Sequence, residues 1–364
     1  MKRPTSTPPG ICVPCRLGAI FTVVAAIAGG FAYAAGWFSP TRLSAPRIID
    51  AFQANAGVHP GYRRNHAKGV CVEGYFDSNG NAAALSVADV FVRGRRTAVT
   101  GRFAIPGSNP SAPDTSVPIR SMALAFMLQD GEQWRTAMNS TPVFAVRTPA
   151  QFYEQLVAAR PDPATGKPNP AKLQAFYKAN PDTRPFQAWV KAHPPASGFA
   201  NGAYYSINAF RFTDSADHTR SVRWAMVPEA PYAPFDARAS SGSDFLASDL
   251  MRQLEAGNLR WHLIVTIAAS GDKTDDATQL WPDDRQHIDA GTLVLERETP
   301  QSDGACRDIN FDPTVLPNGI SPSDDPLLAA RSAAYAVSYK RRTREEAFHP
   351  ETATATAHHD SNPS

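Results

Sequence analysis

The residues of this sequence whose types and spacing could do chemistry are a histidine and an arginine–tyrosine pair. His66 lies in the basic stretch RRNHAKG, just ahead of a strand-like run, where an imidazole could move a proton. Arg331 and Tyr335 are four residues apart, so in a helix their side chains share one face. A guanidinium beside a phenol favours the phenolate, a hard anionic ligand that some proteins give to haem iron. Arg342 follows nearly two turns later, a position that suits a haem propionate.

Each of these features also has an ordinary structural interpretation. Arginine–tyrosine pairs at helical spacing are usually surface contacts, and a single histidine in a basic loop is usually solvated. Composition bounds the alternatives: 364 residues with 43% hydrophobic side chains suffice for one large domain or two ordinary ones. The formal charge of +2 does not point to nucleic acid as a partner.

The first forty residues are typical of a membrane-inserted segment. A leader with three basic residues and no acid precedes an uncharged run over 17–37. As a helix this run would extend about 30 Å, enough to cross a bilayer. The basic side should stay in the cytoplasm, so the body of the protein should be exported. We expect an uncleaved anchor because the run is long for a signal peptide; Ala32-Tyr33-Ala34 resembles a cleavage site and keeps a cleaved signal as the alternative.

Four cysteines raise separate questions. Cys12 and Cys15 have the C-x-x-C spacing of redox or metal sites, but no βαβ pattern surrounds them, which favours a disordered leader with reduced thiols. Cys71 and Cys306 lie in the globular part and could form a disulfide in an exported protein. The sequence alone does not show whether the two meet.

The remaining chain alternates between helical and strand-like patterns. Helices are predicted over 45–57, over several segments within 148–193, over 243–257 and over 325–348. Thr148 is the predicted N-cap of one of them, with Pro149 at its first position. Short apolar runs separated by turn residues predict about eight strands in two sets. This pattern favours an α+β fold, an antiparallel barrel with surrounding helices.

Three regions follow from these patterns. Residues 1–40 form the cytoplasmic leader and membrane anchor or signal, residues 41–348 form the globular domain, and residues 349–364 form a polar tail that we expect to be disordered.

Five motifs, in order over about 60–345, resemble the haem catalases and in particular the small catalase-related peroxidases. The motifs are RRNHAKG, RTAVTGRFAIPGSNPSAPDTSVPIRSMALAF, NSTPVF, LWPDDRQHIDAGTLVLER and FDPTVLPNGISPSDDPLLAARSAAY. The resemblance implies an eight-stranded catalase-type β-barrel. It also implies haem as the cofactor, with type b as the default because no C-x-x-C-H attachment motif occurs.

The resemblance further implies a role for individual residues. His66 matches the distal catalytic histidine, and Tyr335 matches the proximal phenolate that ligates the haem iron. The other cofactor-binding matches are Arg331, which keeps the phenol ionised, Phe152 near the distal face, and the propionate-binding Arg63, Arg102 and Arg342.

The chain departs from the family pattern around the distal histidine. Ser140 stands where catalases place a distal asparagine, and we expect it to take that catalytic position. Ala104 stands where they place a serine that bonds the histidine, so we expect a distal side with few polar partners. No contact is assigned to Arg64, which we expect to be solvated.

These implications predict a haem-dependent peroxidase of antioxidant defence. It would reduce organic hydroperoxides, and some hydrogen peroxide, through an oxoferryl intermediate at the expense of an unknown electron donor. His66 would accept a proton from the peroxide and return it. The protein would work outside the cytoplasm, in the periplasm, anchored to the inner membrane by 17–37; its oligomeric state is left open. The alternatives are a true catalase that dismutates hydrogen peroxide, an allene oxide synthase-like rearrangement of hydroperoxides, and a non-catalytic, membrane-anchored haem carrier.

Overall fold

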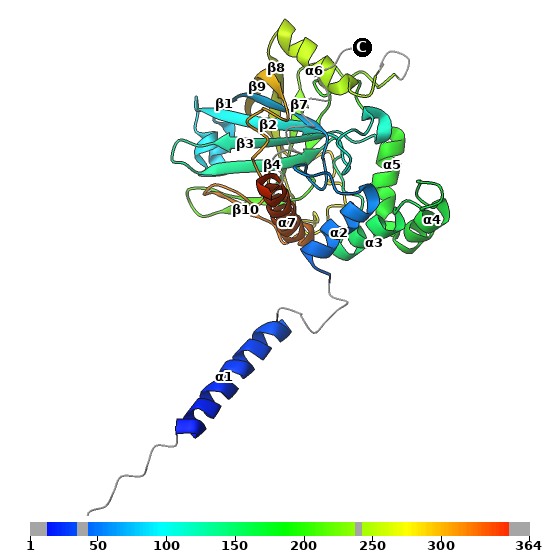
Figure 1. Ribbon diagram of the computed structural model, residues 1–364. Helices are drawn as coiled ribbons and strands as arrows, with labels where there is room; N and C mark the ends of the chain where they lie inside the picture. The colour runs from blue at the N-terminus through cyan, green and yellow to red at the C-terminus, as the bar shows by residue number, and fades with distance from the viewer. Residues whose placement is uncertain (1–12, 35–42, 237–241, 349–364) are drawn as a thin grey trace, which may run out of the picture. The chain divides into compact units, whose positions relative to one another are not determined.

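The structure, a computed structural model, describes residues 13–34, 43–236 and 242–348. The chain divides into two units, residues 1–44 and 45–364. The first unit contains helix α1, Val13–Ala34 (Figure 1). Within it Arg16–Tyr33 is long and apolar enough to cross a membrane, a test that an N-terminal signal sequence passes as well. The last three residues of the predicted span, and the predicted tail at 349–364, lie outside the described residues.

The second unit is built on one antiparallel sheet that closes into a barrel. Its strands are β1 Gly69–Ser78, β2 Arg96–Ala104, β3 Ser121–Met127, β4 Gln133–Asn139, β5 Tyr204–Tyr205, β6 Phe210–Thr213, β7 Thr219–Pro228, β8 Leu259–Ile267, β9 His287–Pro300 and β10 Ile320–Pro322. The order β7-β5-β4-β3-β2-β1-β9-β8 forms a ring, because β7 also pairs with β8. Strands β6 and β10 extend the sheet beyond β7. The predicted eight-stranded antiparallel barrel is confirmed.

The interior of the barrel is filled by large aromatic side chains. Alternate residues of β4 point inward, as a strand half-buried on a core requires. Trp134 on this strand packs against Phe126 at a ring-centroid distance of 4.8 Å and against Trp224 at 5.1 Å. The barrel is therefore a packed core, and an opening for a ligand has to lie outside it.

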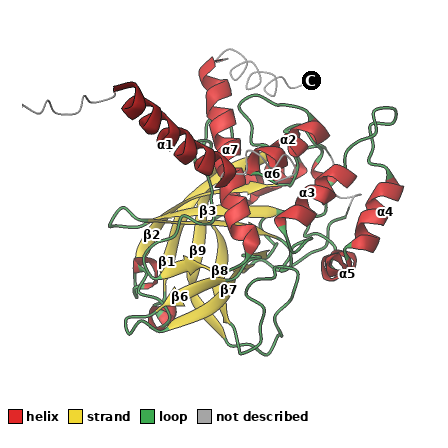
Figure 2. Cartoon of the chain, turned by 90° about the horizontal axis from the view of Figure 1, so that it is seen from below, coloured by secondary structure: helices red, strands yellow, loops and turns green. Residues whose placement is uncertain are grey.

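The helices that bear on function lie side by side against the barrel. They are α2 Ala45–Ala56, α3 Pro149–Ala158 and α7 Pro326–Phe348, which contact one another (Figures 1 and 2). Helices α4 Pro170–Ala179 and α5 Arg184–Ala192 follow α3, and α6 Phe245–Ala256 packs against β9. The predicted cap is confirmed: Thr148 and Gln151 form a reciprocal capping box, and Pro149 is the first residue of α3.

Candidate active site

A cavity of about 1230 Å³, a volume that includes its open mouth, lies between the barrel and the three helices. One wall comes from the ends of β2, β3 and β4, and the others come from α2, α3, α7 and residues 309–311. The cavity brings together seven of the eight sequence-predicted site residues: His66, Arg63, Arg102, Phe152, Arg331, Tyr335 and Arg342. Segments nearly 270 residues apart in the chain thus contribute to one site.

His66 lies just before β1. Its ring bonds to Ser121, and Ser121 in turn bonds to Asn139. Its Nε2 is 3.0 Å from Ser121 Oγ, and this hydroxyl donates to Asn139 Oδ1 at 2.8 Å. A hydroxyl has one proton, so the oxygen that donates to Asn139 accepts the proton on His66 Nε2. The other ring nitrogen, Nδ1, therefore carries the lone pair.

Burial and charge keep the His66 ring neutral. Burial, followed by the guanidiniums of Arg102, Arg331 and Arg63 in that order, lowers its pKa from 6.5 to about 3. The backbone at this residue has φ of 56°, in the left-handed region that non-glycine residues rarely adopt. A neutral imidazole in a constrained orientation can accept a proton from a molecule in the cavity.

The structure corrects the expected composition of this side of the cavity. Ser140 lies outside the lining, and its Oγ accepts a hydrogen bond from the backbone N–H of Arg120 at 2.9 Å. Asn139, the residue before it, lines the cavity instead, because side chains alternate along β4. The missing serine at 104 is supplied by Ser121, which pairs with Ala104 across β2 and β3 and with Asn139 across β3 and β4.

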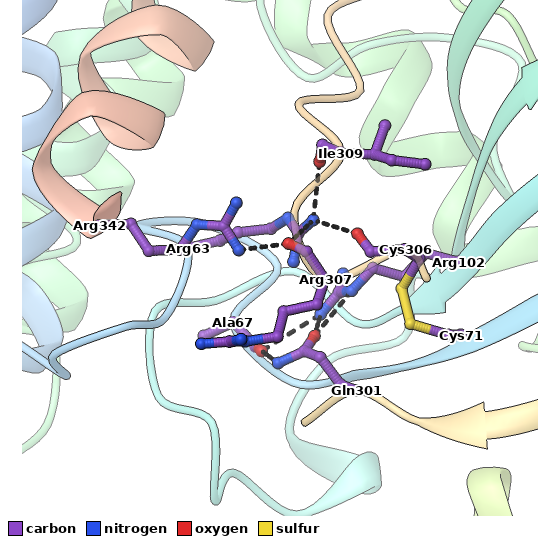
Figure 3. The surroundings of a disulfide bond; sticks show 9 residues. All are labelled: Arg63, Ala67, Cys71, Arg102, Gln301, Cys306, Arg307, Ile309 and Arg342. Atoms are coloured by element: carbon purple, nitrogen blue, oxygen red, sulfur yellow. Dashed lines mark hydrogen bonds between the residues drawn. A yellow bond between two sulfur atoms is a disulfide. The ribbon is translucent and has the colours of Figure 1, made fainter. Parts of the chain in front are cut away.

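Three arginine side chains form a cationic cluster at another part of the cavity. Arg63 donates from Nη2 to three backbone carbonyls, those of Cys306 (2.9 Å), Arg307 (3.1 Å) and Ile309 (2.9 Å). Arg102 donates from Nε to Gln301 Oε1 at 2.7 Å, and Arg342 donates to the carbonyl of Arg307 (Figure 3). None of the three forms an ion pair with a carboxylate of the described residues.

The electrostatics of this cluster call for an anion. Burial and the Arg342 guanidinium lower the pKa of Arg63 to about 9. Burial and the guanidiniums of Arg63 and Arg342 lower that of Arg102 well below its usual value. Burial also lowers the pKa of Arg342, whose Nε has no hydrogen-bond partner among the described residues. Buried cations are normally paired, because an unpaired charge in a protein interior is costly. A ligand with two carboxylates, such as haem, would supply the missing charge.

A glycine of the basic motif makes room for this cluster. A Cβ at position 69 would come within 2.5 Å of the Arg102 guanidinium and 2.3 Å of the Phe103 carbonyl oxygen. The glycine in RRNHAKG is thus needed for the close approach of β1 to Arg102.

Arg331 and Tyr335 both line the cavity from α7, as the four-residue spacing requires. Arg331 donates to Asn208 Oδ1 and to the carbonyl of Ala137 at 2.8 Å. Asn208 in turn donates to Asp325 Oδ2 at 2.7 Å. These contacts fix the guanidinium on the Tyr335 face of the helix, and a phenol there offers an oxygen ligand to an iron in the cavity.

Apolar side chains from α2 and α3 complete the cavity. Phe152 packs against Phe52 of α2 at a ring-centroid distance of 5.8 Å and against Phe144 at 5.7 Å. Ile48 and Ile49 of α2 extend this wall. A flat, largely apolar ring system with charged groups at one edge matches these surroundings, so the residues present fit haem.

Three residues of the site, Ser121, Asn139 and Gln301, were not found by reading the sequence. Asn139 lay inside the NSTPVF motif, but only the strand alternation selects it over Ser140.

The expectation that Arg64 is solvated was wrong: its side chain is 2% exposed and forms an ion pair with Glu345. Among the described residues no group of three or more His, Cys, Asp or Glu side chains could hold a metal ion.

Comparisons with known proteins agree with this geometry. The family model described as "Catalase" matches residues 35–349. A catalase-related peroxidase of Synechococcus elongatus is 38% identical, over 84% of this chain and 91% of that protein. A catalase-related peroxidase of Mycolicibacterium paratuberculosis is 30% identical, over 83% of this chain and 95% of that protein.

Solved structures support the fold. A fungal catalase superposes with a TM-score of 0.71 at 20% identity, covering 78% of this chain and 60% of its own. Catalase A from Saccharomyces cerevisiae gives 0.70 at 20% identity, covering 78% of this chain and 62% of its own. The chain therefore spans about three fifths of these larger catalases and most of the small peroxidases. With the barrel, the cavity and these matches together, the chain belongs to the catalase family, as a peroxide oxidoreductase of the catalase-related peroxidase type.

Proposed function

We propose that this protein is a haem peroxidase that reduces organic hydroperoxides, and that the cavity beside α7 is its active site. When bound, haem supplies a redox-active iron at which a peroxide is reduced. Tyr335 would provide an oxygen ligand for that iron, with Arg331 favouring its phenolate. Arg63, Arg102 and Arg342 would bind the propionates, and Phe152 would pack against the porphyrin. The observation that carries the proposal is the buried arginine cluster, which forms no ion pair with a carboxylate of the described residues, in the same cavity as His66 and Tyr335.

The proton chemistry belongs to His66. Its Nδ1 accepts the proton from one peroxide oxygen and returns it to the other, so that the leaving fragment departs as an alcohol or as water. Ser121 and Asn139 hold the ring in the tautomer that this task requires. Ser140 has no part in the step.

The apolar wall of the cavity supports organic hydroperoxides as the substrates. Ile48, Ile49 and Phe52 of α2 and Phe152 of α3 offer surface to an alkyl or aryl group. The sequence-based reason, a poor set of distal polar groups, no longer contributes, because Ser121 and Asn139 are present.

A second candidate, the dismutation of hydrogen peroxide, is favoured by one observation. The series His66–Ser121–Asn139 provides ordered polar groups that can orient a small peroxide. The two candidates share the cofactor and the proton acceptor, and they differ in what reduces the oxidised enzyme.

The test compares two assays on the purified, haem-loaded protein. We expect reduction of tert-butyl hydroperoxide with an aromatic donor to exceed the release of O₂ from hydrogen peroxide. The reverse order would make dismutation the main activity. His66→Ala should keep the haem spectrum and lose turnover, whereas Tyr335→Phe should alter the spectrum and haem occupancy. A protein that takes up no haem, or a His66→Ala variant with full turnover, would reject the proposal.

For the location we propose that residues 1–40 anchor the haem domain, residues 41–348, to the inner membrane on its periplasmic side. The uncharged run of helix α1 that follows Arg16 and the basic leader supports an anchor. A disulfide in the haem domain supports an oxidising compartment, since such bonds are rare in the cytosol.

A further inference from the structure

One short segment, residues 301–309, binds all three arginines of the cationic cluster. Its carbonyls at Cys306, Arg307 and Ile309 accept from Arg63, and that of Arg307 also accepts from Arg342. The side chain of Gln301 at its start accepts from Arg102 (Figure 3). We call residues 301–309 the clamp segment. The position of every guanidinium in the cluster thus depends on where this segment lies.

The clamp segment has no regular secondary structure of its own. It follows the end of β9 at Pro300 and consists of consecutive turns, with backbone bonds such as Gly304 N–H to Pro300 O (2.9 Å) and Arg307 N–H to Gly304 O (2.9 Å). The β1–β9 ladder ends where Pro300 pairs with Val70, so no β-ladder holds the residues beyond it. Gln301 donates to the carbonyl of Ala67 at 3.1 Å, and a second link lies further along the segment.

That link is a disulfide between Cys306 of the clamp segment and Cys71 of β1, a residue 235 positions earlier. Both cysteines are fully buried. Gly304 lies directly on the bond, since a Cβ at this position would be 2.5 Å from Cys71 Sγ and 2.6 Å from Thr299 Oγ1. The segment is thus fixed to β1 by a covalent bond and by close packing around it.

The same disulfide also borders the helix that carries the proposed iron ligand. Cys71 and Cys306 form a small apolar cluster with Ala125 and Phe311, against which Tyr335 packs. The cluster around the bond therefore contacts Tyr335 of α7, and the bond itself ends in the segment whose carbonyls accept from the arginines.

Electrostatics explain why the clamp segment needs a covalent link. Carbonyl oxygens accept hydrogen bonds but carry no net charge. The carboxylates of Asp308 and Glu346 offset part of the cluster's charge without forming an ion pair with it, so the neighbouring guanidiniums still repel one another before an anion binds. Without a fixed segment the cluster could relax by moving apart or outward into solvent. Such a cluster would lose the geometry that two carboxylates of one ligand require.

From these observations we propose that the Cys71–Cys306 disulfide is a positioning element of the cofactor site: it holds the clamp segment so that Arg63, Arg102 and Arg342 are preorganised for the two haem propionates. This rests on the proposed function, because it takes haem as the ligand. It predicts that the oxidised protein recognises the carboxylates of haem and that a protein without the bond does so poorly.

The test measures recognition of the carboxylates separately from general stability. Haem and its dimethyl ester differ only in the charge of the propionates. The full chain in detergent is loaded with each, and the loss of porphyrin to a haem-scavenging protein is timed for wild type and for Cys71→Ala/Cys306→Ala. We expect the variant to release haem about tenfold faster and to release the ester at nearly the wild-type rate. The ratio of the two release rates, that of the ester divided by that of haem, should therefore fall.

Two further variants keep the result interpretable. Leu263→Ala, a fully buried residue on β8 away from the cavity, weakens the barrel without touching the clamp segment and should leave the ratio of the two release rates unchanged. Gly304→Ala keeps both cysteines but forces the segment away from Cys71, so it should lower the ratio even if the double variant does not fold.

The possible outcomes separate the inference from the proposed function. If wild type takes up haem and the ratio of the two release rates is the same in the cysteine and Gly304 variants as in wild type, the disulfide is only a general staple and the inference is wrong. If wild type does not take up haem at all, the proposed function has failed before the cysteines are tested. A ratio that falls in these variants and persists in Leu263→Ala supports the inference.

Discussion

At the scale of single residues, the neutral state of His66 has a measurable consequence. Its pKa lies at about 3, so the lone pair on Nδ1 remains available well below neutral pH. An imidazole with an ordinary pKa would be protonated progressively below about pH 6.5 and would stop accepting protons. The environment of the ring, rather than the ring itself, thus sets the working range of the enzyme.

We expect kcat/KM for the hydroperoxide to be flat between about pH 4.5 and 8, with no inflection near the ordinary histidine pKa.

The free energy of unfolding, in contrast to kcat/KM, should depend on pH in this range. The unfolded chain protonates His66 below about pH 6.5 while the folded chain does not, so this residue lowers the free energy of unfolding as pH falls toward 3. Initial rates and denaturant midpoints across this range check both. An inflection near pH 6.5 in kcat/KM that is absent from binding would contradict the assignment.

The two serines near the site allow a direct comparison. Ser121→Ala removes the acceptor of the His66 Nε2 proton, and we expect kcat/KM per haem to fall about tenfold. Ser140→Ala removes a hydroxyl that only accepts from the backbone of Arg120, and the rate should stay within about twofold of wild type. Haem content measured by absorbance normalises both. Loss of activity in Ser140→Ala alone would restore the sequence-based interpretation.

At the scale of elements, the register of three strands explains what the sequence could and could not predict. Ala104, Ser121 and Asn139 form one row across β2, β3 and β4. Motif order located His66 and the arginines because each is marked by its own neighbours in the chain. The hydroxyl that bonds His66 belongs to Ser121 of β3, which pairs with Ala104 of β2. These two residues are 17 positions apart, and a single sequence does not reveal a pairing between strands. The sequence therefore predicted too few polar groups from Ala104 and Ser140, because it did not show that Ser121 and Asn139 lie in the same row as Ala104.

Helix α3 shows the opposite case, a local device that the sequence fully determines. Thr148 accepts from the N–H of Gln151 at 3.2 Å, and the Gln151 side chain accepts from the N–H of Thr148 at 3.1 Å. We expect Thr148→Ala to lower the free energy of unfolding by about 1 kcal/mol, while Thr148→Ser keeps the cap and most of the stability. Urea denaturation of the two variants checks this. Equal loss in both would mean that the threonine methyl group, and not the cap, stabilises α3.

At the scale of the whole molecule, three features support the proposal that the protein is exported. The basic leader and the uncharged run after Arg16 were evident from the sequence, because hydrophobic length and charge are local properties. The pairing of Cys71 with Cys306 was not, since it depends on a fold that brings positions 235 residues apart into contact. A bond that closes so long a loop contributes about 5 kcal/mol in the chain-entropy account, a contribution available only where disulfides form.

The last prediction joins this bond to the membrane segment. In a bacterial host the full chain should fractionate with membranes, and Cys71 and Cys306 should resist alkylation until a reductant is added under denaturing conditions. A Cys12→Ser/Cys15→Ser background removes the leader thiols, so that the count reports on the pair alone. Removal of residues 1–42 should keep the chain in the cytoplasm with both thiols reduced and with a lower Tm, which oxidation of the purified protein should raise again. Free thiols at 71 and 306 in the membrane-bound protein would show that the haem domain faces the cytoplasm, and the orientation derived from the basic leader would then be reversed.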